Sequence, residues 1–375
     1  MKTSPHLYRT LAPAGLDSAI VDRALVLDSR QSASGVQPIY TLRHLAHMSG
    51  VSYAFLRRVV ERESDPYNIY TIRKRDGKSL RSIAAPSEAL AAVQRWLLDQ
   101  TFARMPSTPW SFAYEKDNSS VKCAQEHLGA TWLLKMDLKD FFHQTDERDV
   151  YHLLRKYRYS ELVAFELARI VTRSVRDPQD WLPPKYASTV EWRRGAGFPY
   201  GKRVRLGYLP QGASTSGAIA NVLASGLDRA LHELAISHGT TYTRYADDLT
   251  FSGGPYDRAS AREFASSVTS AIFAAGYTPN KKKTRLIAPG RRLEVLGVLV
   301  NGSKLRVPAR FRKRVEAHLY GLESHGVMGH LHSRGFRDID GMSRHILGLI
   351  AHVHAVDSSL AKVYYTRFAS AFPNP

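Results

Sequence analysis

YTRYADDLTFSG, at residues 242–253, sets two carboxylates side by side between two runs in which apolar and polar residues alternate. Alternation with a period of two is the pattern of a strand with one buried face, so the stretch is predicted to fold as a hairpin with Asp247 and Asp248 at its tip. Adjacent aspartates are also ordinary turn residues, and this structural explanation stays open. The rest of the chain decides between the two.

Positive charge dominates the composition. The 375 residues include 53 Lys and Arg against 34 Asp and Glu, which gives a formal net charge of +19. Such an excess indicates a polyanionic partner, of which nucleic acid is the first candidate. The single cysteine, Cys123, excludes an intrachain disulfide and a cysteine-built zinc site. Without an apolar leader or a long apolar run, we expect a cytoplasmic protein with two or three packed units and no membrane partner.

Local patterns predict an α+β protein. A basic hairpin is expected within residues 67–86, turning at Asp76-Gly77, and a second hairpin turning at Asn301-Gly302. A buried strand is expected at residues 132–138. Helical spacing is found in several further segments: residues 40–62 as two short helices, 87–102, 119–128, 147–172, a long helix from about Ser214, 257–275 and most of the last 70 residues. Residues 173–207 are predicted to form a long loop, which is typical of a functional or mobile segment.

Asp137 ends the strand predicted at residues 132–138, in the run TWLLKMDLKDFF. If that strand lies beside the hairpin at 242–253, Asp137, Asp247 and Asp248 come together. Nucleotide addition uses two divalent ions about 4 Å apart, and Mg²⁺ prefers hard oxygen ligands such as carboxylates. Taken alone, Asp137 is as well explained as a helix N-cap. The combination of the three acids is what indicates a catalytic site.

The order of the motifs matches a known polymerase plan. The basic hairpin, the strand ending MDLKDFF, the turn LPQG, the hairpin YADD, the run NKKKT and the hairpin VLGVLVN follow one another, and over residues 67–307 the chain resembles bacterial retron-type reverse transcriptases. The resemblance implies a right-hand polymerase fold with fingers, a palm of antiparallel sheet plus helices, and a helical thumb. The implied domains are an N-terminal extension at 1–45, fingers at 46–130 with 150–205 interleaved, a palm at 131–149 and 206–302, and a thumb at 303–375.

The resemblance also implies roles for individual residues. Asp137, Asp247 and Asp248 would be catalytic and would bind two Mg²⁺ ions, with the backbone carbonyl of Leu138 as a further ligand. Phe142 would be an aromatic gate against the ribose 2′-hydroxyl, although core packing beside its neighbour is the alternative. The implied binding residues for the dNTP substrates are Lys74, Arg81, Phe142, Gln211, Gly212 and Lys282. Any one of the lysines at 281–283 could be the general acid for pyrophosphate release.

Two signatures of retron enzymes are matched imperfectly. The NAxxH element corresponds to Cys123, Ala124 and His127, with Cys in place of Asn, and the VTG element reads VLG at residues 295–297. The LPQG motif carries Ser214 and Gly217 where prolines are common. These departures leave the polymerase assignment intact and weaken the retron subclass. His127 could contact RNA or be a satisfied core histidine, and both explanations are open.

A retron enzyme would bind its own structured noncoding RNA, prime from a guanosine 2′-hydroxyl and make single-stranded DNA, leaving a branched RNA-DNA product (msDNA). The implied role is antiphage defence with an effector protein, which these residues do not identify. RNA binding is expected at Arg310, Arg312, Lys313, Arg314 and His127. The histidines of the last 70 residues repeat no metal-ligand spacing and are expected to be buried or to face RNA. The loop at 173–207, with Trp181, Trp192, Arg193 and Arg194, is a hypothetical extra contact.

Other classes of protein remain as alternatives. An abortive-infection or diversity-generating reverse transcriptase would differ in template and priming. A non-catalytic RNA-binding module would keep its function after loss of Asp247 and Asp248. A group II intron enzyme would need a longer region after the thumb, and a cyclase would have no use for the basic hairpin or the LPQG turn.

Overall fold

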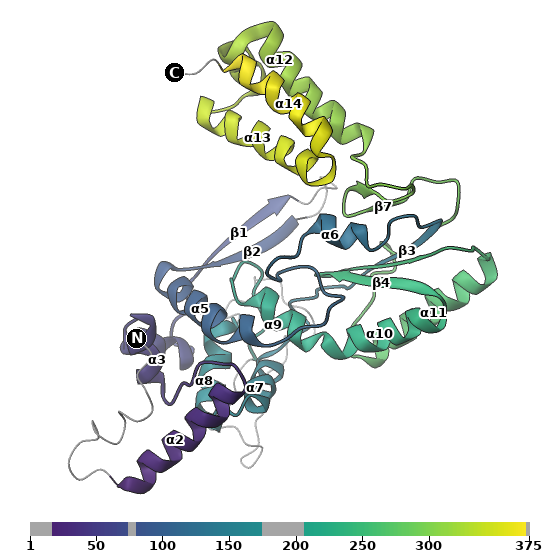
Figure 1. Cartoon of the computed structure of the whole chain (residues 1–375). Coiled ribbons are helices and arrows are strands. Elements are labelled where there is room, and N and C mark those ends of the chain that lie inside the picture. Colours follow the sequence, from purple (N-terminus) through teal and green to yellow (C-terminus); the bar gives the residue numbers. More distant parts are fainter. Residues whose placement is uncertain (1–16, 74–79, 175–205, 373–375) are drawn as a thin grey trace. The chain divides into compact units, whose positions relative to one another are not determined.

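The computed structural model describes residues 17–73, 80–174 and 206–372, which are coloured in Figure 1. The chain divides into two compact units, one made of residues 1–109 and 139–228, the other of residues 110–138 and 229–375. Each unit mixes helices with antiparallel strands, as the sequence predicts.

The first unit contains a two-stranded antiparallel ribbon and a set of short helices. β1 (Tyr67–Arg73) pairs with β2 (Leu80–Pro86), which confirms the basic hairpin, while its turn at Asp76-Gly77 lies outside the described residues. The helices are α2 (Ser18–Ala33), α3 (Leu42–Ser49), α4 (Tyr53–Val60), α5 (Glu88–Gln100), η1 (Phe102–Arg104), α7 (Glu147–Lys156), α8 (Glu161–Val171) and α9 (Ser216–Leu223). The predicted pair at 40–62 is confirmed, with Gly50 at a φ of 70° between its two helices.

A buried ion cluster joins α7 and α8 to the turn that follows α4. The Glu147 carboxylate accepts from Arg62 Nη2 at 2.7 Å and from Arg169 Nε at 3.0 Å. The same carboxylate accepts from the backbone N–H of Gly207 at 3.0 Å. Burial favours a raised pKa for Glu147, but the two guanidinium groups together hold that pKa below its ordinary value. The charges are therefore compensated inside the protein.

The second unit is built on a four-stranded antiparallel sheet in the order β4-β5-β3-β6. Its strands are β3 (Trp132–Asp137), β4 (Thr240–Tyr245), β5 (Asp248–Gly253) and β6 (Arg285–Ile287). One face packs on helix α11 (Arg258–Ala274), whose Phe264 meets the rings of Trp132 and Phe251 edge to face. The other face is covered at one end by α6 (Ser120–Gln125) and the ribbon β7 (Glu294–Val295) with β8 (Val298–Leu299), which share a core with Leu133.

Several boundaries differ from the sequence prediction. The chain reverses at Asn301-Gly302 as predicted, but β7 and β8 are joined by an additional turn at Leu296-Gly297, with φ values of 46° and 87°, which the sequence did not indicate. Asn301-Gly302 lies in a wider loop closed by a bridge between Leu299 and Arg306. The helix predicted from Ser214 is divided into α9 and α10 (Ser225–Ser237), and the segment at 147–172 into α7 and α8. Local turn signals fix the presence of a turn better than its pairing.

Three helices follow the second ribbon: α12 (Ala309–Arg334), α13 (Ile339–Val356) and α14 (Ser358–Ala371). They lie side by side in Figure 1 and share a core that includes Leu319, Ile346 and Tyr364. Gly326 interrupts α12 with a φ of 66° and a ψ of 174°, so the chain folds back and His330 Nε2 comes within 3.0 Å of His318 Nδ1. In the part of the chain that the structure describes, no helix is long and apolar enough to cross a membrane.

Candidate active site

Asp137, Asp247 and Asp248 come together at one end of the four-stranded sheet. Asp137 is the last residue of β3, and its Cα pairs with that of Asp248 at the start of β5. Asp247 precedes Asp248 in the tight β4–β5 turn, where Ala246 has a φ of 57°. The Leu138 N–H donates to the Asp247 carbonyl at 2.8 Å and closes the turn against β3. The sequence prediction that these strands are neighbours is therefore confirmed.

Asp137 is held by two side chains from the segment before β6. Its Oδ1 accepts from Asn280 Nδ2 at 3.0 Å, and its Oδ2 lies 2.5 Å from Lys283 Nζ. The Asn280 N–H also donates to the Asp137 carbonyl at 2.7 Å. Asp137 is 3% exposed, while the Lys283 side chain is 59% exposed. The Lys283 side chain is therefore mostly in solvent, while the Asp137 carboxylate that it contacts is buried and oriented by Asn280.

The three acids repel one another electrostatically. Burial, together with the charges of Asp248 and Asp137, raises the pKa of Asp247 to about 6. Burial also raises the pKa of Asp248, with Lys135 opposing and Asp137 adding to the shift. Lys283 has a raised pKa because its bond to Asp137 and the three negative charges outweigh burial. Such a concentration of negative charge is relieved by a bound cation.

The donor set fits Mg²⁺ in its chemistry. Carboxylate and carbonyl oxygens are the hard ligands that Mg²⁺ prefers, and the sheet supplies three carboxylates at one edge. Among the described residues, no group of three His, Cys, Asp or Glu side chains is arranged closely enough to hold a metal ion as it stands. Lys283 supplies the counter-charge to Asp137 in this arrangement. Binding of an ion would require the ammonium to give way to it.

Of the three lysines left open as the general acid, Lys283 is the one that reaches the aspartates. Lys282, which is expected to bind nucleotide, is exposed in the turn before β6, and the next residue, Lys283, lies against Asp137. Three consecutive lysines carry no local signal that tells them apart, and only the tertiary position of the turn does. Asn280 was not singled out at all, although it opens the NKKKT run. Both are found only once β3 and this turn are seen together.

The turn at Gln211-Gly212 lies in the first unit and is fastened to β2. The Gln211 carbonyl accepts from the Ala84 N–H at 2.8 Å. Gly212 has a φ of 125°, and a Cβ there would lie 2.7 Å from the Ala84 carbonyl oxygen. Only glycine fits this position without strain. Arg81 is exposed on the same strand, opposite Ile72 of β1, while Lys74 lies outside the described residues.

Phe142 also lies in the first unit and is half-buried, with its ring centroid 5.6 Å from that of Phe141. Phe141 is 4% exposed and belongs to the core. The two neighbours thus have different environments, and Phe142 is the less buried of the two. Both the gate and the packing explanation are consistent with this position.

The residues expected to bind RNA separate into two groups. Arg310, Arg312, Lys313 and Arg314 are exposed at the start of α12, where Arg310 pairs with Glu294. His127 is 1% exposed, and its ring nitrogens bond to Ser252 Oγ at 2.8 Å and Thr243 Oγ1 at 2.7 Å. Of the two explanations left open for His127, the structure supports the core histidine.

The family assignment comes from comparison with known proteins. Residues 72–300 match the family model described as reverse transcriptase (RNA-dependent DNA polymerase). The retron Mx162 reverse transcriptase of Myxococcus xanthus is 35% identical over 294 residues, which are 75% of this chain and 58% of that protein. The retron Mx65 reverse transcriptase of the same organism is 32% identical over 348 residues, 91% of this chain and 74% of that protein.

A retron reverse transcriptase from a different bacterium is also similar to this chain. The retron Ec86 reverse transcriptase of Escherichia coli is 27% identical over 326 residues, 86% of this chain and 87% of that protein. The segment matched by the family model contains the three aspartates and the lysine run. The chain belongs to the reverse transcriptase (RNA-dependent DNA polymerase) family, as a member of the bacterial retron type.

Proposed function

We propose that the chain is a retron reverse transcriptase that adds deoxynucleotides by two-metal nucleotidyl transfer at Asp137, Asp247 and Asp248. The observation that carries the proposal is the convergence of these acids from adjacent antiparallel strands, where burial and the neighbouring charges of Asp248 and Asp137 raise the pKa of Asp247 to about 6. Two bound Mg²⁺ ions would activate the attacking hydroxyl and neutralise charge on the triphosphate and leaving pyrophosphate. The Leu138 carbonyl is a further proposed ligand.

The chain's own residues would position the Asp137 carboxylate and the dNTP and would protonate the leaving pyrophosphate. Asn280 fixes the orientation of the Asp137 carboxylate through a bond of 3.0 Å. Lys283 keeps its proton at Nζ because its pKa is raised, and we assign it as the general acid toward the leaving pyrophosphate. Arg81, Lys74, Gln211, Gly212 and Phe142 are proposed to bind and select the dNTP, with the Gly212 turn fixed against β2. The domain boundaries given above for fingers, palm and thumb belong to the same proposal.

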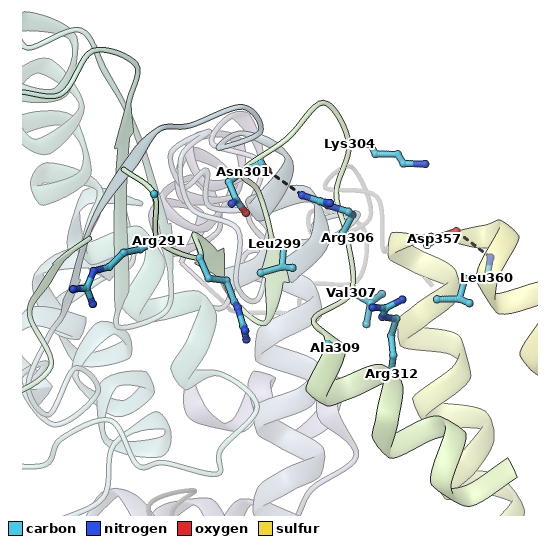
Figure 2. A pocket seen from close by; sticks show the side chains of 12 residues that line it. Arg291, Leu299, Asn301, Lys304, Arg306, Val307, Ala309, Arg312, Asp357 and Leu360 are labelled. Atoms are coloured by element: carbon cyan, nitrogen blue, oxygen red, sulfur yellow. Dashed lines mark hydrogen bonds between the residues drawn. The ribbon is translucent and has the colours of Figure 1, made fainter. Parts of the chain in front are cut away.

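A basic hollow in the second unit supports the proposal of an RNA partner. The hollow measures about 590 Å³ and lies between the loop around Asn301 and the first turns of α12 and α14 (Figure 2). Its twelve lining residues include one acid, Asp357, whose Oδ1 accepts from the Leu360 N–H at 3.0 Å. Five are cationic: Arg291, Arg292, Lys304, Arg306 and Arg312. Clustered cations of this kind hold RNA through its phosphates.

The finer reaction follows the family resemblance. The enzyme would prime from a guanosine 2′-hydroxyl of its own structured RNA, form a branched RNA-DNA product and act with an effector protein in antiphage defence. The four basic residues at the start of α12 are proposed RNA contacts. The extra contact proposed for residues 173–207 falls mostly outside the described residues, including Trp181, Trp192, Arg193 and Arg194.

The polymerase proposal is tested with purified protein, a short RNA template, a DNA primer and radiolabelled dNTP. Wild type should extend the primer only with Mg²⁺ or Mn²⁺ present, and Asp247→Asn should abolish extension while its melting temperature and RNA affinity stay unchanged. Extension that survives in Asp247→Asn would contradict the proposal. Separate replacement of Arg291, Arg306 and Arg312 by Ala should weaken RNA binding and lower its salt dependence by about one ion per residue.

A further inference from the structure

A polar network is buried on the face of the sheet that carries the aspartates. Cross-strand partners project to the same face, and the register pairs Asp137 with Asp248, Lys135 with Thr250, and Thr250 with Thr243. Ser252 follows on the same face of β5, because side chains alternate along a strand. Three hydroxyl side chains of this face, Thr243, Thr250 and Ser252, are between 1% and 4% exposed. Hydroxyl groups at this depth need partners.

His127 provides those partners for both strands of the catalytic hairpin. Its Nε2 lies 2.7 Å from Thr243 Oγ1 on β4, and its Nδ1 lies 2.8 Å from Ser252 Oγ on β5. Cys123 Sγ, one turn earlier in the chain, lies 3.2 Å from the same Thr243 hydroxyl. A single imidazole therefore bridges the two strands and ties them to the segment around α6. Its pKa is lowered to about 3 by burial, so the ring is neutral and has one donor and one acceptor.

The bridge lies behind the catalytic turn. Ser252 is four residues from Asp248 along β5, a distance of roughly 13 Å at the usual rise of a strand. Thr243 of β4 lies opposite Thr250, which is two residues from Asp248. The Asp248 charge is nonetheless felt at Cys123, whose thiol pKa rises to about 11 mainly through burial, with Asp248 contributing. A change in the spacing or tilt of β4 and β5 at the bridge is thus carried to the turn by two paired strands.

We propose that His127 is a positioning residue of the polymerase, which sets the spacing of β4 and β5 and through them the placement of Asp247 and Asp248 relative to Asp137. The inference rests on the proposed role of these aspartates. His127 is 1% exposed and would act through the Thr243 and Ser252 hydroxyls to which it is bonded. A displacement of reacting groups by about 1 Å lowers the reaction rate on the order of 100-fold.

The test compares His127→Phe, which keeps a ring of similar size and removes both bonds, with His238→Phe as a matched control. His238 is exposed and lies beside Phe264, under the opposite face of the sheet. We expect His127→Phe to lower the extension rate per folded molecule by about 10- to 100-fold. Its KM for dNTP and its RNA affinity should stay within about twofold, as expected when only transition-state geometry is lost. Mn²⁺ binding by the free protein, followed by electron paramagnetic resonance, should weaken by roughly tenfold.

Two further variants keep the test decisive if His127→Phe does not fold. Thr243→Val and Ser252→Ala each remove one hydroxyl. Each should lower the extension rate less than His127→Phe does and leave the KM for dNTP unchanged. The side chain of His127→Gln can bond to only one of the two hydroxyls. The rise in activation free energy for extension in the double variant Thr243→Val, His127→Gln should therefore be smaller than the sum of the rises in the two single variants. Unchanged rates and Mn²⁺ binding in these variants would overturn the proposal, as would a loss confined to RNA affinity. If wild type itself makes no DNA, the proposed function fails instead.

Discussion

Replacement of Lys283 by Met is expected to have opposite effects on catalysis and on metal binding. The Lys283 ammonium lies 2.5 Å from Asp137 Oδ2, but its side chain is 59% exposed. An ion pair this exposed contributes about 0–1 kcal/mol to folding, so the melting temperature should hardly change. If Lys283 is the general acid, Lys283→Met should lower kcat by about 100- to 10,000-fold. The loss should appear with saturating dNTP, since the ammonium acts in the chemical step.

Metal binding should change in the other direction. The ammonium competes with a cation for the Asp137 carboxylate, and a unit charge about 4 Å away costs about 1 kcal/mol in a water-like environment. Lys283→Met should therefore bind Mn²⁺ roughly fivefold more tightly in the absence of nucleic acid. Electron paramagnetic resonance measures the free ion, and rapid-quench extension measures kcat on the same preparation.

Lys282→Met is the matched control, because that neighbouring lysine is exposed and is not the one that reaches Asp137. Its kcat and Mn²⁺ affinity should match wild type. The reasoning is refuted if Lys282→Met loses kcat while Lys283→Met extends primers within about threefold of wild type.

Three further changes act through other parts of the fold. Gly212→Ala should cost about 1–3 kcal/mol in urea unfolding, because its φ is 125° and a Cβ would lie 2.7 Å from a carbonyl oxygen, whereas Gly254→Ala, with open space around it, should not. Glu147→Gln should cost about 3–5 kcal/mol, since two buried guanidinium groups lose their counter-charge; an unchanged urea midpoint would contradict this. Burial and neighbouring positive charge lower the pKa of His318 to about 4. The unfolded chain therefore binds more protons than the folded chain, and stability should fall as pH drops from about 6.5 toward 4. The dependence of melting temperature on pH should be weaker in His318→Phe and unchanged in His332→Phe.

Sequence patterns predicted most of the elements that build the site. The YADD hairpin and the strand ending at Asp137 are marked by alternation and by an apolar run, and the structure pairs them as expected. The turn at Leu296-Gly297 was missed because Asn301-Gly302 is the stronger local signal, and the choice between them depends on which strands pair. Local patterns thus locate strands and turns, while pairing partners come from the tertiary fold.

The parts of the site that were missed are contacts between distant segments. Lys283 differs from its two neighbours only in its position relative to Asp137, 146 residues earlier. His127 could not be assigned to core or surface from KCAQEHLGA alone, since its partners Thr243 and Ser252 are 116 and 125 residues away. Arg244 is fully buried and donates to the Ala246 carbonyl at 3.2 Å inside the β4–β5 turn, although a lone arginine in a strand suggests a surface position.

The most direct test is to examine the nucleic acid that copurifies with the protein when it is expressed with its own flanking sequences. RNase-treated material from wild type should contain a discrete single-stranded DNA that shortens after debranching. The same band should be absent from the Asp247→Ala, Asp248→Ala variant, which should still carry RNA. Bound RNA with no such DNA in wild type, or DNA that persists in the variant, would contradict the assignment of these aspartates to retron DNA synthesis.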